Sequence, residues 1–433
     1  MPRQSSVNAS SNPFDGRHRP ERGFVPKTNP WTAKWIWLNK DVYPDRQECA
    51  RTRFCKGAPP YTLALFRKRF ELPFTPRRAA AWISSDTRHV CAINGETVDR
   101  GPAEAGGDFR NTESPSWWFY DGVDVTDALR EGDNVIAAEV VMGPLVMADL
   151  SMGRGGFLLE LEIEGPDGQT LRIATDSRWR GRLCEAAASP WFYDGRREPD
   201  GWRDVAFDDA GWPYGTCLGP AEQSHWRLLP REIPALLETC VRPETFVTLP
   251  GLMDGRFDNP DALTRNEKGA LTVTPGAPAT FWLGFERELA GYLRLDVDGP
   301  GGTEIRVAHL ETPGETADED ERATFILPGR RWQHVTRHLR GFQYLQVKVA
   351  FPGGAVCRQP LKIHAVEAVF TSFPVRYEGA FECSDERLNR IWEAGRWTNQ
   401  LCMQSYHLDS PLHQEPPGDT GDYLVEALVS YYA

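Results

Sequence analysis

Apolar and polar residues alternate in short segments from Trp31 to about residue 375, and turn-forming residues separate these segments. In the clearest segment, Tyr292–Asp298, three aliphatic residues alternate with an arginine and two aspartates before a Gly-Pro-Gly-Gly turn. Successive side chains of a strand point to opposite faces of the sheet, so this pattern predicts one buried and one solvated face. The Asn94-Gly95 dipeptide is typical of the turn between two antiparallel strands. We therefore expect a mainly β protein built from antiparallel sandwiches.

The alternation gives way to a helical period of about 3.6 residues after residue 376. Ser384 precedes two acidic residues there, which predicts a helix with Ser384 as its N-cap. Apolar residues at helical spacing then form two stripes, Leu388, Ile391, Trp392, Gly395 and Cys402, and Leu424, Val425, Leu428, Tyr431 and Tyr432. Two amphipathic helices cannot cover both stripes by themselves, so we expect an incomplete helical domain.

These changes of pattern divide the chain into four predicted parts. Residues 1–30 are rich in Ser, Asn, Pro and Arg and lack periodicity, which indicates a flexible tail. A first β-sandwich is expected over residues 31–235 and a second over residues 236–375. The helical part follows over residues 376–433.

Charge and short motifs exclude several classes of function. A formal net charge of −12 argues against a nucleic-acid partner, whose phosphates need a basic surface. The nine cysteines are scattered without a Cys-x-x-Cys pair, so neither a disulfide framework nor a zinc site is expected. No Gly-x-Gly-x-x-Gly or Walker motif occurs, and we predict no cofactor. Asp254, Asp258, Asn259 and Asp261 offer oxygen ligands without the EF-hand spacing, and we predict no metal.

Apolar runs long enough for a signal-peptide core or a transmembrane helix are absent from the sequence. We therefore expect a cytoplasmic protein without a membrane partner. The sequence leaves the oligomeric state open.

Acidic residues are concentrated between Asp409 and Glu426, where five carboxylates are interrupted by prolines and glycines. Proline removes a backbone donor and fixes φ, so the prolines prevent one continuous helix and predict a rigid, turning loop. Glycosidases hold general acids on such loops, because a rigid backbone positions the carboxyl group and neighbouring acids raise its pKa. An ordinary solvated turn between two helices is the alternative interpretation.

The order of these parts resembles the bacterial α-L-rhamnosidase family of glycoside hydrolases. The resemblance rests on the following landmarks: Trp35-Ile-Trp37, Phe66-Arg-Lys68, Ile93-Asn-Gly95, Tyr193-Asp194, Gly201-Trp202, Gly284–Gly291, His309-Leu-Glu311, Arg340–Tyr344 and Cys383-Ser-Asp385. Family members continue with Asp-Cys-Pro-x-Arg-Glu and Gly-Trp-x-Gly-Asp. Here Asp409 and Pro411 match the first Asp and the Pro, Glu415 matches the Glu, and Asp422 matches the final Asp. Asp419 occupies the position of the Trp.

The resemblance implies an inverting glycosidase that acts on terminal α-L-rhamnosyl or related residues. Glu415 is then the candidate general acid, and the candidate substrate-binding residues are Asp409, His413, Asp419 and Asp422. The family's general base is a glutamate further downstream in an (α/α)6 barrel, so we expect the chain to be an incomplete form with a carbohydrate partner. A non-catalytic carbohydrate-binding β-sandwich protein, or an inactive fragment, is the alternative.

The pentapeptide Trp-Phe-Tyr-Asp-Gly occurs twice, at residues 118–122 and 191–195. Aromatic rings beside an acid can form a platform for a sugar, which makes Tyr120, Asp121, Tyr193 and Asp194 secondary sugar-binding candidates. The alternative, which we prefer, is a pair of strand ends with buried rings.

Overall fold

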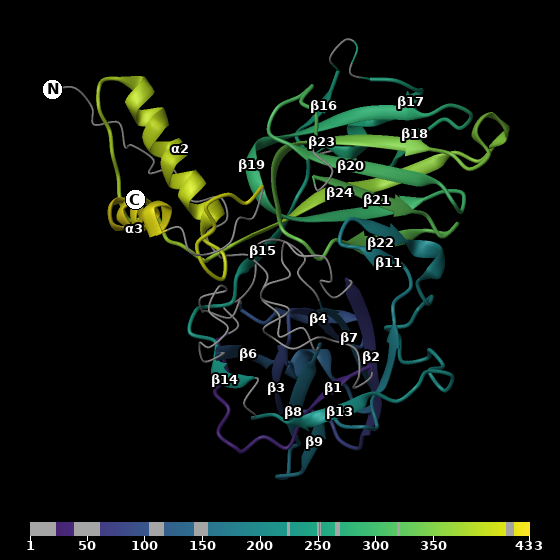
Figure 1. Ribbon diagram of the computed structural model, residues 1–433, viewed down its shortest axis with the longest axis vertical. Coiled ribbons are helices and arrows are strands. Elements are labelled where there is room, and N and C mark those ends of the chain that lie inside the picture. The colour runs from purple at the N-terminus through teal and green to yellow at the C-terminus, as the bar shows by residue number, and fades with distance from the viewer. Residues whose placement is uncertain are drawn as a thin grey trace, which may run out of the picture.

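The computed structural model describes residues 23–38, 61–103, 117–142, 155–222, 226–248, 251, 253–264, 269–317, 321–412 and 420–433. Figure 1 shows two β modules stacked along the longest axis, with two helices projecting beside them. This arrangement confirms the prediction of two β-sandwich domains followed by the first helices of an α-helical domain. Neither described helix is long and apolar enough to cross a membrane.

The first module, in the lower half of Figure 1, consists of two sheets. The seven-stranded sheet contains, in spatial order, β13 (Thr216–Pro220), β1 (Lys34–Trp37), β8 (Phe157–Glu164), β3 (Arg78–Ser85), β6 (Trp117–Asp124) and β14 (Arg227–Pro230), with β9 (Thr170–Ala174) beside β8. The five-stranded sheet contains β10 (Arg180–Leu183), β2 (Thr62–Leu72), β7 (Gly132–Met142), β4 (Arg88–Ile93) and β5 (Glu96–Gly101). Apolar side chains from both sheets meet between them, among them Ile36, Phe66, Ile83, Ile136 and Leu159.

Part of the predicted flexible tail is docked on this module. The Val25 amide donates to the Gly122 carbonyl at 2.9 Å, and the Lys27 ammonium pairs with Glu160 at 2.7 Å. Glu160 is fully buried, and its second carboxylate oxygen accepts from the Thr32 and Ala33 amides. The packed chain therefore begins before Trp31, because this buried carboxylate needs the lysine and the amides of the segment.

The second module is one twelve-stranded sheet that folds around its own core. Its main path contains β11 (Ala187–Ser189), β12 (Phe192–Asp194), β21 (Arg322–Ile326), β20 (Glu304–Leu310), β23 (Arg340–Ala350), β19 (Ala279–Asp298), β24 (Leu361–Ser372), β18 (Leu271–Val273) and β17 (Phe257–Asp258). Three more strands pair from the side, β15 (Leu237–Val241) with β24, and β16 (Thr245–Val247) and β22 (Trp332–Val335) with β19. Short 3-10 helices lie at Thr126–Ala128, Gly195–Arg197, Pro260–Leu263 and Gly354–Val356.

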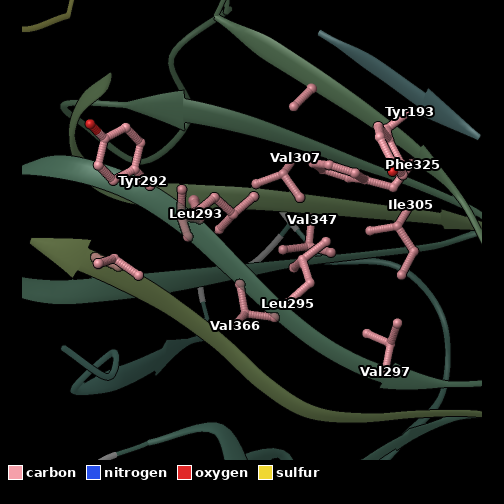
Figure 2. Packing of buried hydrophobic residues seen from close by; sticks show 14 of the residues in the cluster. Tyr193, Tyr292, Leu293, Leu295, Val297, Ile305, Val307, Phe325, Val347 and Val366 are labelled. Carbon is pink, nitrogen blue, oxygen red and sulfur yellow. The ribbon is translucent and has the colours of Figure 1, made fainter. Parts of the chain in front are cut away.

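The long strand β19 connects the two layers of this module. Its first half pairs with β23 and its second half with β24, and the change of partner falls at Gly291. A Cβ atom at Gly291 would lie 2.3 Å from the Val369 carbonyl oxygen, so only glycine allows this close crossing. Figure 2 shows Leu293, Leu295 and Val297 of β19 packed in the core with apolar residues of the neighbouring strands.

The polar side of β19 is not solvated as the alternation predicts. Asp296 is 5% exposed and accepts two hydrogen bonds of 2.9 Å from the Arg331 guanidinium. Arg294, on the same side, pairs with Glu367 of β24. Ion pairs with neighbouring residues therefore cover this face, and a simple alternation does not reveal them.

The two modules share one apolar core, so the predicted boundary near residue 235 does not separate them completely. Leu63 and Leu65 of β2 and Val141 of β7 belong to the same cluster as the interior of the second module. Strands β11 and β12 lie within the predicted first sandwich by sequence, yet β12 pairs with β21 of the second module. This pairing is parallel, as is that of β14 with β6, whereas the sequence predicted antiparallel strands.

Helices α2 (Glu386–Cys402) and α3 (Thr420–Tyr432) follow the second module. Asp385, rather than the predicted Ser384, is the N-cap of α2, and its side chain accepts from the Arg387 amide at 2.9 Å. The C-terminal half of α2 contacts the sheet, where the Trp397 ring stacks on Phe370 with 5.6 Å between centroids. The N-terminal half is exposed, with Ile391 65% accessible.

Candidate active site

The acidic segment begins in a tight turn that closes the end of α2. The Leu408 amide donates to the Cys402 carbonyl at 2.9 Å, and Met403 and His407 form an isolated β-bridge. These bonds fold the chain back at the end of the helix and bring Asp409 beside Cys402. The Cys402 thiol donates a hydrogen bond to the Asp409 carbonyl oxygen, with 3.8 Å between sulfur and oxygen.

The segment after Asp409 is attached to strand β23 of the second module. The Gly341 amide donates to the Pro411 carbonyl at 3.0 Å, and the Arg340 guanidinium donates to the Leu412 carbonyl at 3.3 Å. A Cβ atom at Gly341 would lie 3.0 Å from the Leu412 nitrogen and 3.2 Å from the Pro411 Cβ. The absence of a side chain at Gly341 thus permits the close docking of this segment.

Three carboxylates from different elements surround the buried Cys402 thiol. Burial, together with the nearby Glu426, Asp409 and Glu288 carboxylates, raises the pKa of this thiol to about 12. Glu426 belongs to α3 and Glu288 to β19. The fold therefore gathers acidic side chains from a turn, a helix and the second β module around one point.

Glu426 contacts a histidine of the turn. The His407 Nδ1 atom lies 2.7 Å from a Glu426 carboxylate oxygen, and the Glu426 side chain is 14% exposed. This contact joins α3 to the turn that carries Asp409. Glu426 is the last acid of the acidic segment and was not among the predicted site residues.

Glu288 is a half-buried acid that sequence reasoning missed. Burial raises the pKa of its carboxyl group, and the nearby Glu311 carboxylate raises it further. One Glu288 oxygen lies 3.3 Å from the position that a Cβ of Gly341 would occupy, which places it beside the docked Pro411–Leu412 segment. In the sequence, Glu288 lies in the Gly284–Gly291 landmark segment, at an irregularity of β19 that spans Gly284 to Leu289. This interruption of the strand alternation was the one sequence signal that could have indicated Glu288 as a site residue.

The structure describes two of the five predicted site residues of the loop. Asp409 is half-buried, and its carboxylate accepts from the Ser410 amide at 2.6 Å. Asp422 is exposed in the first turn of α3. His413, Glu415 and Asp419 lie outside the described residues.

The rings of the two pentapeptides are buried. Tyr120 is 8% exposed and contacts the rings of Phe24 and Trp31. Tyr193 is 4% exposed and stacks on Trp332. Neither ring offers an open face for a sugar, and these contacts favour the interpretation of buried rings at strand ends.

The acids of the two pentapeptides are also engaged within the protein. Asp121 is buried and pairs with Arg231, while Asp194 caps the 3-10 helix at Gly195 and pairs with Arg196. A sugar contact at either position stays a prediction. Among the described residues, one group of three side chains could hold a metal ion, and it contains Asp121.

Comparisons with known proteins agree with this architecture. Residues 75–232 match the α-L-rhamnosidase N-terminal domain, residues 277–369 match the bacterial α-L-rhamnosidase concanavalin-like domain, and residues 376–433 match the bacterial α-L-rhamnosidase six-hairpin glycosidase domain. The three matched stretches follow one another along the chain without overlap.

Two curated relatives carry the name α-L-rhamnosidase. The protein from Streptomyces avermitilis is 28% identical over 391 residues, and the alignment covers 84% of this chain and 34% of the relative. The protein from Formosa agariphila is 21% identical over 444 residues, which cover 93% of this chain and 42% of the relative. This chain thus spans well under half the length of either relative.

Solved structures show the same fold. A GH78 family rhamnosidase of Bacillus sp. GL1 superposes with a TM-score of 0.72 at 20% identity, over 94% of this chain and 62% of that chain. The Streptomyces avermitilis α-L-rhamnosidase complexed with L-rhamnose superposes with a TM-score of 0.60 at 21% identity, over 86% and 36% of the two chains. Three successive stretches of the sequence match three domain models of one family, and the chain belongs to the bacterial α-L-rhamnosidase family.

Proposed function

We propose that this chain supplies the acid side of a glycoside hydrolase active site that hydrolyses terminal α-L-rhamnosyl, or related, residues with inversion. In this proposal Glu415 protonates the leaving oxygen, and Asp409 and Asp422 bind sugar hydroxyls together with His413 and Asp419. An inverting enzyme uses a second carboxylate, about 6.5–9.5 Å from the acid, to activate the attacking water.

The observation that carries the proposal is the anchoring of the Asp409 segment. This segment is bonded to Cys402 on one side and to Gly341 and Arg340 on the other, so its backbone is fixed before the loop begins. Rigid placement of acids is what general acid catalysis requires, because the proton donor must lie within hydrogen-bond reach of the leaving oxygen.

The carboxylates beside this segment add electrostatic support. Burial raises the pKa of Glu288, and the nearby Glu311 carboxylate raises it further, because like charges held close together favour the protonated form of one member. A general acid needs the same effect in order to stay protonated near neutrality. The rhamnoside is proposed because the two curated relatives are named α-L-rhamnosidases and one solved relative was complexed with L-rhamnose.

Hydrolysis of an aryl α-L-rhamnoside, beside a panel of other aryl glycosides, tests the proposal. In a protein that also carries the second carboxylate, we expect Glu415→Gln to lower kcat by about 100-fold or more, since a positioned general acid contributes about 10²–10⁴-fold. The matched control is Glu382→Gln, because Glu382 is an exposed glutamate just before α2, and it should leave the rate unchanged.

Binding of L-rhamnose, followed by calorimetry, tests the sugar contacts separately. We expect Asp409→Asn to weaken binding by about 10-fold, the loss of one charge-assisted hydrogen bond. Turnover that survives Glu415→Gln contradicts the assigned acid. Absence of both turnover and rhamnose binding in the wild-type chain contradicts the proposal as a whole.

A further inference from the structure

Three potential metal ligands converge at one end of the first module. His89 lies on β4, Asp99 on β5 and Asp121 on β6, so the group joins the five-stranded sheet to the seven-stranded one. One ligand atom from each residue lies within 4.8 Å of the other two. All three side chains are at least half-buried.

His89 is oriented as a metal-binding imidazole would be. Its Nδ1 atom lies 3.0 Å from the Ser85 hydroxyl, and its Nε2 atom lies 2.7 Å from Asp99. The Nε2 atom shares a proton with the Asp99 carboxylate, and a cation that displaces this proton would meet the Nε2 lone pair. Metal-bound histidines in proteins are held by such an outer hydrogen bond on the opposite ring nitrogen.

Asp121 has an unused carboxylate oxygen that lies against Gly101, the residue of β5 opposite His89. Asp121 is 2% exposed, and one of its carboxylate oxygens accepts from the Arg231 guanidinium. The other oxygen, Oδ2, is buried and accepts no hydrogen bond from the described residues. A buried carboxylate oxygen without a hydrogen-bond partner destabilises the folded protein. A cation bound to this oxygen would replace the missing interaction.

Space beside the group is provided by a glycine and a cavity. A Cβ atom at Gly101 would lie 2.0 Å from Asp121 Oδ2, so any larger residue would displace this oxygen. A cavity between the two modules reaches the group, and its lining includes His89, Gly101, Tyr292 and Ser405. Water or another small ligand can therefore reach the cluster from one side.

We propose that His89 Nε2, Asp99 and Asp121 Oδ2 bind one divalent transition-metal ion of the zinc class, with water from the cavity as a fourth ligand. One imidazole and two carboxylates form a donor set that zinc accepts in tetrahedral geometry. Calcium, which takes 6–8 oxygen ligands, fits this group poorly. Ser85 and Arg231 hold the ligands in place from outside the coordination sphere.

Titration of tag-free, chelator-treated full chain with zinc, and with calcium and magnesium for comparison, tests the proposal by calorimetry. We expect one equivalent of zinc to bind, and this equivalent to be lost in Asp121→Asn and in His89→Gln. Ser85→Ala should weaken binding by about 10–100-fold, as loss of an outer hydrogen bond does at other metal sites. Asp194→Asn is the matched control, since it removes the corresponding buried acid from the second pentapeptide, and it should leave binding unchanged.

Cobalt substitution distinguishes this site from adventitious binding to the cysteines. The proposal expects a visible cobalt spectrum of a tetrahedral nitrogen and oxygen site, without a thiolate-to-metal band, that disappears in Asp121→Asn. Absence of zinc binding, or binding that persists in Asp121→Asn, overturns the proposal and leaves a metal-free ion-pair network of His89, Asp99, Asp121 and Arg231. If Asp121→Asn or His89→Gln fails to fold by circular dichroism, Ser85→Ala and the cobalt spectrum of the wild type decide.

Discussion

Three histidines of the second module are buried, His309, His334 and His338, and burial lowers the pKa of each. For His309 the pKa falls from 6.5 to about 4, although a hydrogen bond to the Glu321 carbonyl opposes the shift. The unfolded chain therefore takes up a proton near pH 6.5, whereas the folded chain does so only near pH 4. The stability from this residue is complete above about pH 6.5 and is lost as the pH falls toward 4.

His309→Gln isolates this contribution. At about 1.4 kcal/mol per pKa unit, His309 accounts for about 3 kcal/mol of the stability lost between pH 6.5 and 4. Between pH 6.5 and 4, we expect the free energy of unfolding of the variant to fall by about 3 kcal/mol less than that of the wild type. Urea unfolding at several pH values measures the difference. Equal losses in the two proteins would contradict a neutral, buried His309.

Glu139 of β7 links the two modules through Arg337, which follows β22, and through Arg203. Burial alone would raise the pKa of Glu139, but the two guanidinium groups outweigh it and hold the pKa far below its usual range. We expect Glu139→Gln to destabilise the protein by about 3–5 kcal/mol, because it leaves Arg337 buried and unneutralised. Chemical unfolding at pH 7 measures the loss. The exposed Glu164, paired with Arg77, is the control, and Glu164→Gln should change stability by no more than about 1 kcal/mol.

At the scale of elements, helix α2 is held at its C-terminal half. The Trp397 indole donates to the Glu288 carbonyl at 2.8 Å and stacks on Phe370 of β24. We expect Trp397→Ala to cost about 3–5 kcal/mol locally and to speed amide hydrogen exchange in residues 386–412. Exchange mass spectrometry measures the effect. Ile391→Ala, at an exposed position of the same helix, should stay within about 0.5 kcal/mol of the wild type.

The same helix shows where sequence pattern stops being informative. The spacing of Leu388, Ile391 and Cys402 predicts one apolar stripe, and the helix forms over Glu386–Cys402 as expected. Only the C-terminal end of the stripe is buried. Cys402 packs against the turn that follows α2, whereas Leu388 and Ile391 are exposed. Periodicity identifies a face of a helix, but it does not identify the element that covers it.

The whole molecule has one apolar cluster that runs through both modules. Leu63 of β2 and Phe325 of β21 belong to it, and the Glu139–Arg337 pair crosses the same junction. Because unfolding one module would expose the core of the other, we expect a single cooperative heat-absorption peak in calorimetry. Two well separated transitions would show that the shared cluster does not couple the modules.

Much of this architecture could be predicted from local pattern, since strand alternation and the change to helical period are properties of neighbouring residues. The parallel pairing of Tyr193 with Phe325 could not, because it joins residues far apart in the chain. Among the candidate site residues, Asp409 and Asp422 are predicted from a motif. Glu288 approaches Pro411 only through the docking of Gly341, a contact between distant residues that no spacing encodes.

Strand β12 has a consequence for how such proteins can change by recombination. It is encoded well before residue 235, yet it lies between β11 and β21 in the sheet that is formed mostly by residues after that point. Recombination between two genes near residue 235 would join a second module from one parent to strand β12 from the other. Strand β21 would then pair with a strand that did not evolve with it. Inheritance therefore favours transfer of the two modules together, as one evolutionary unit.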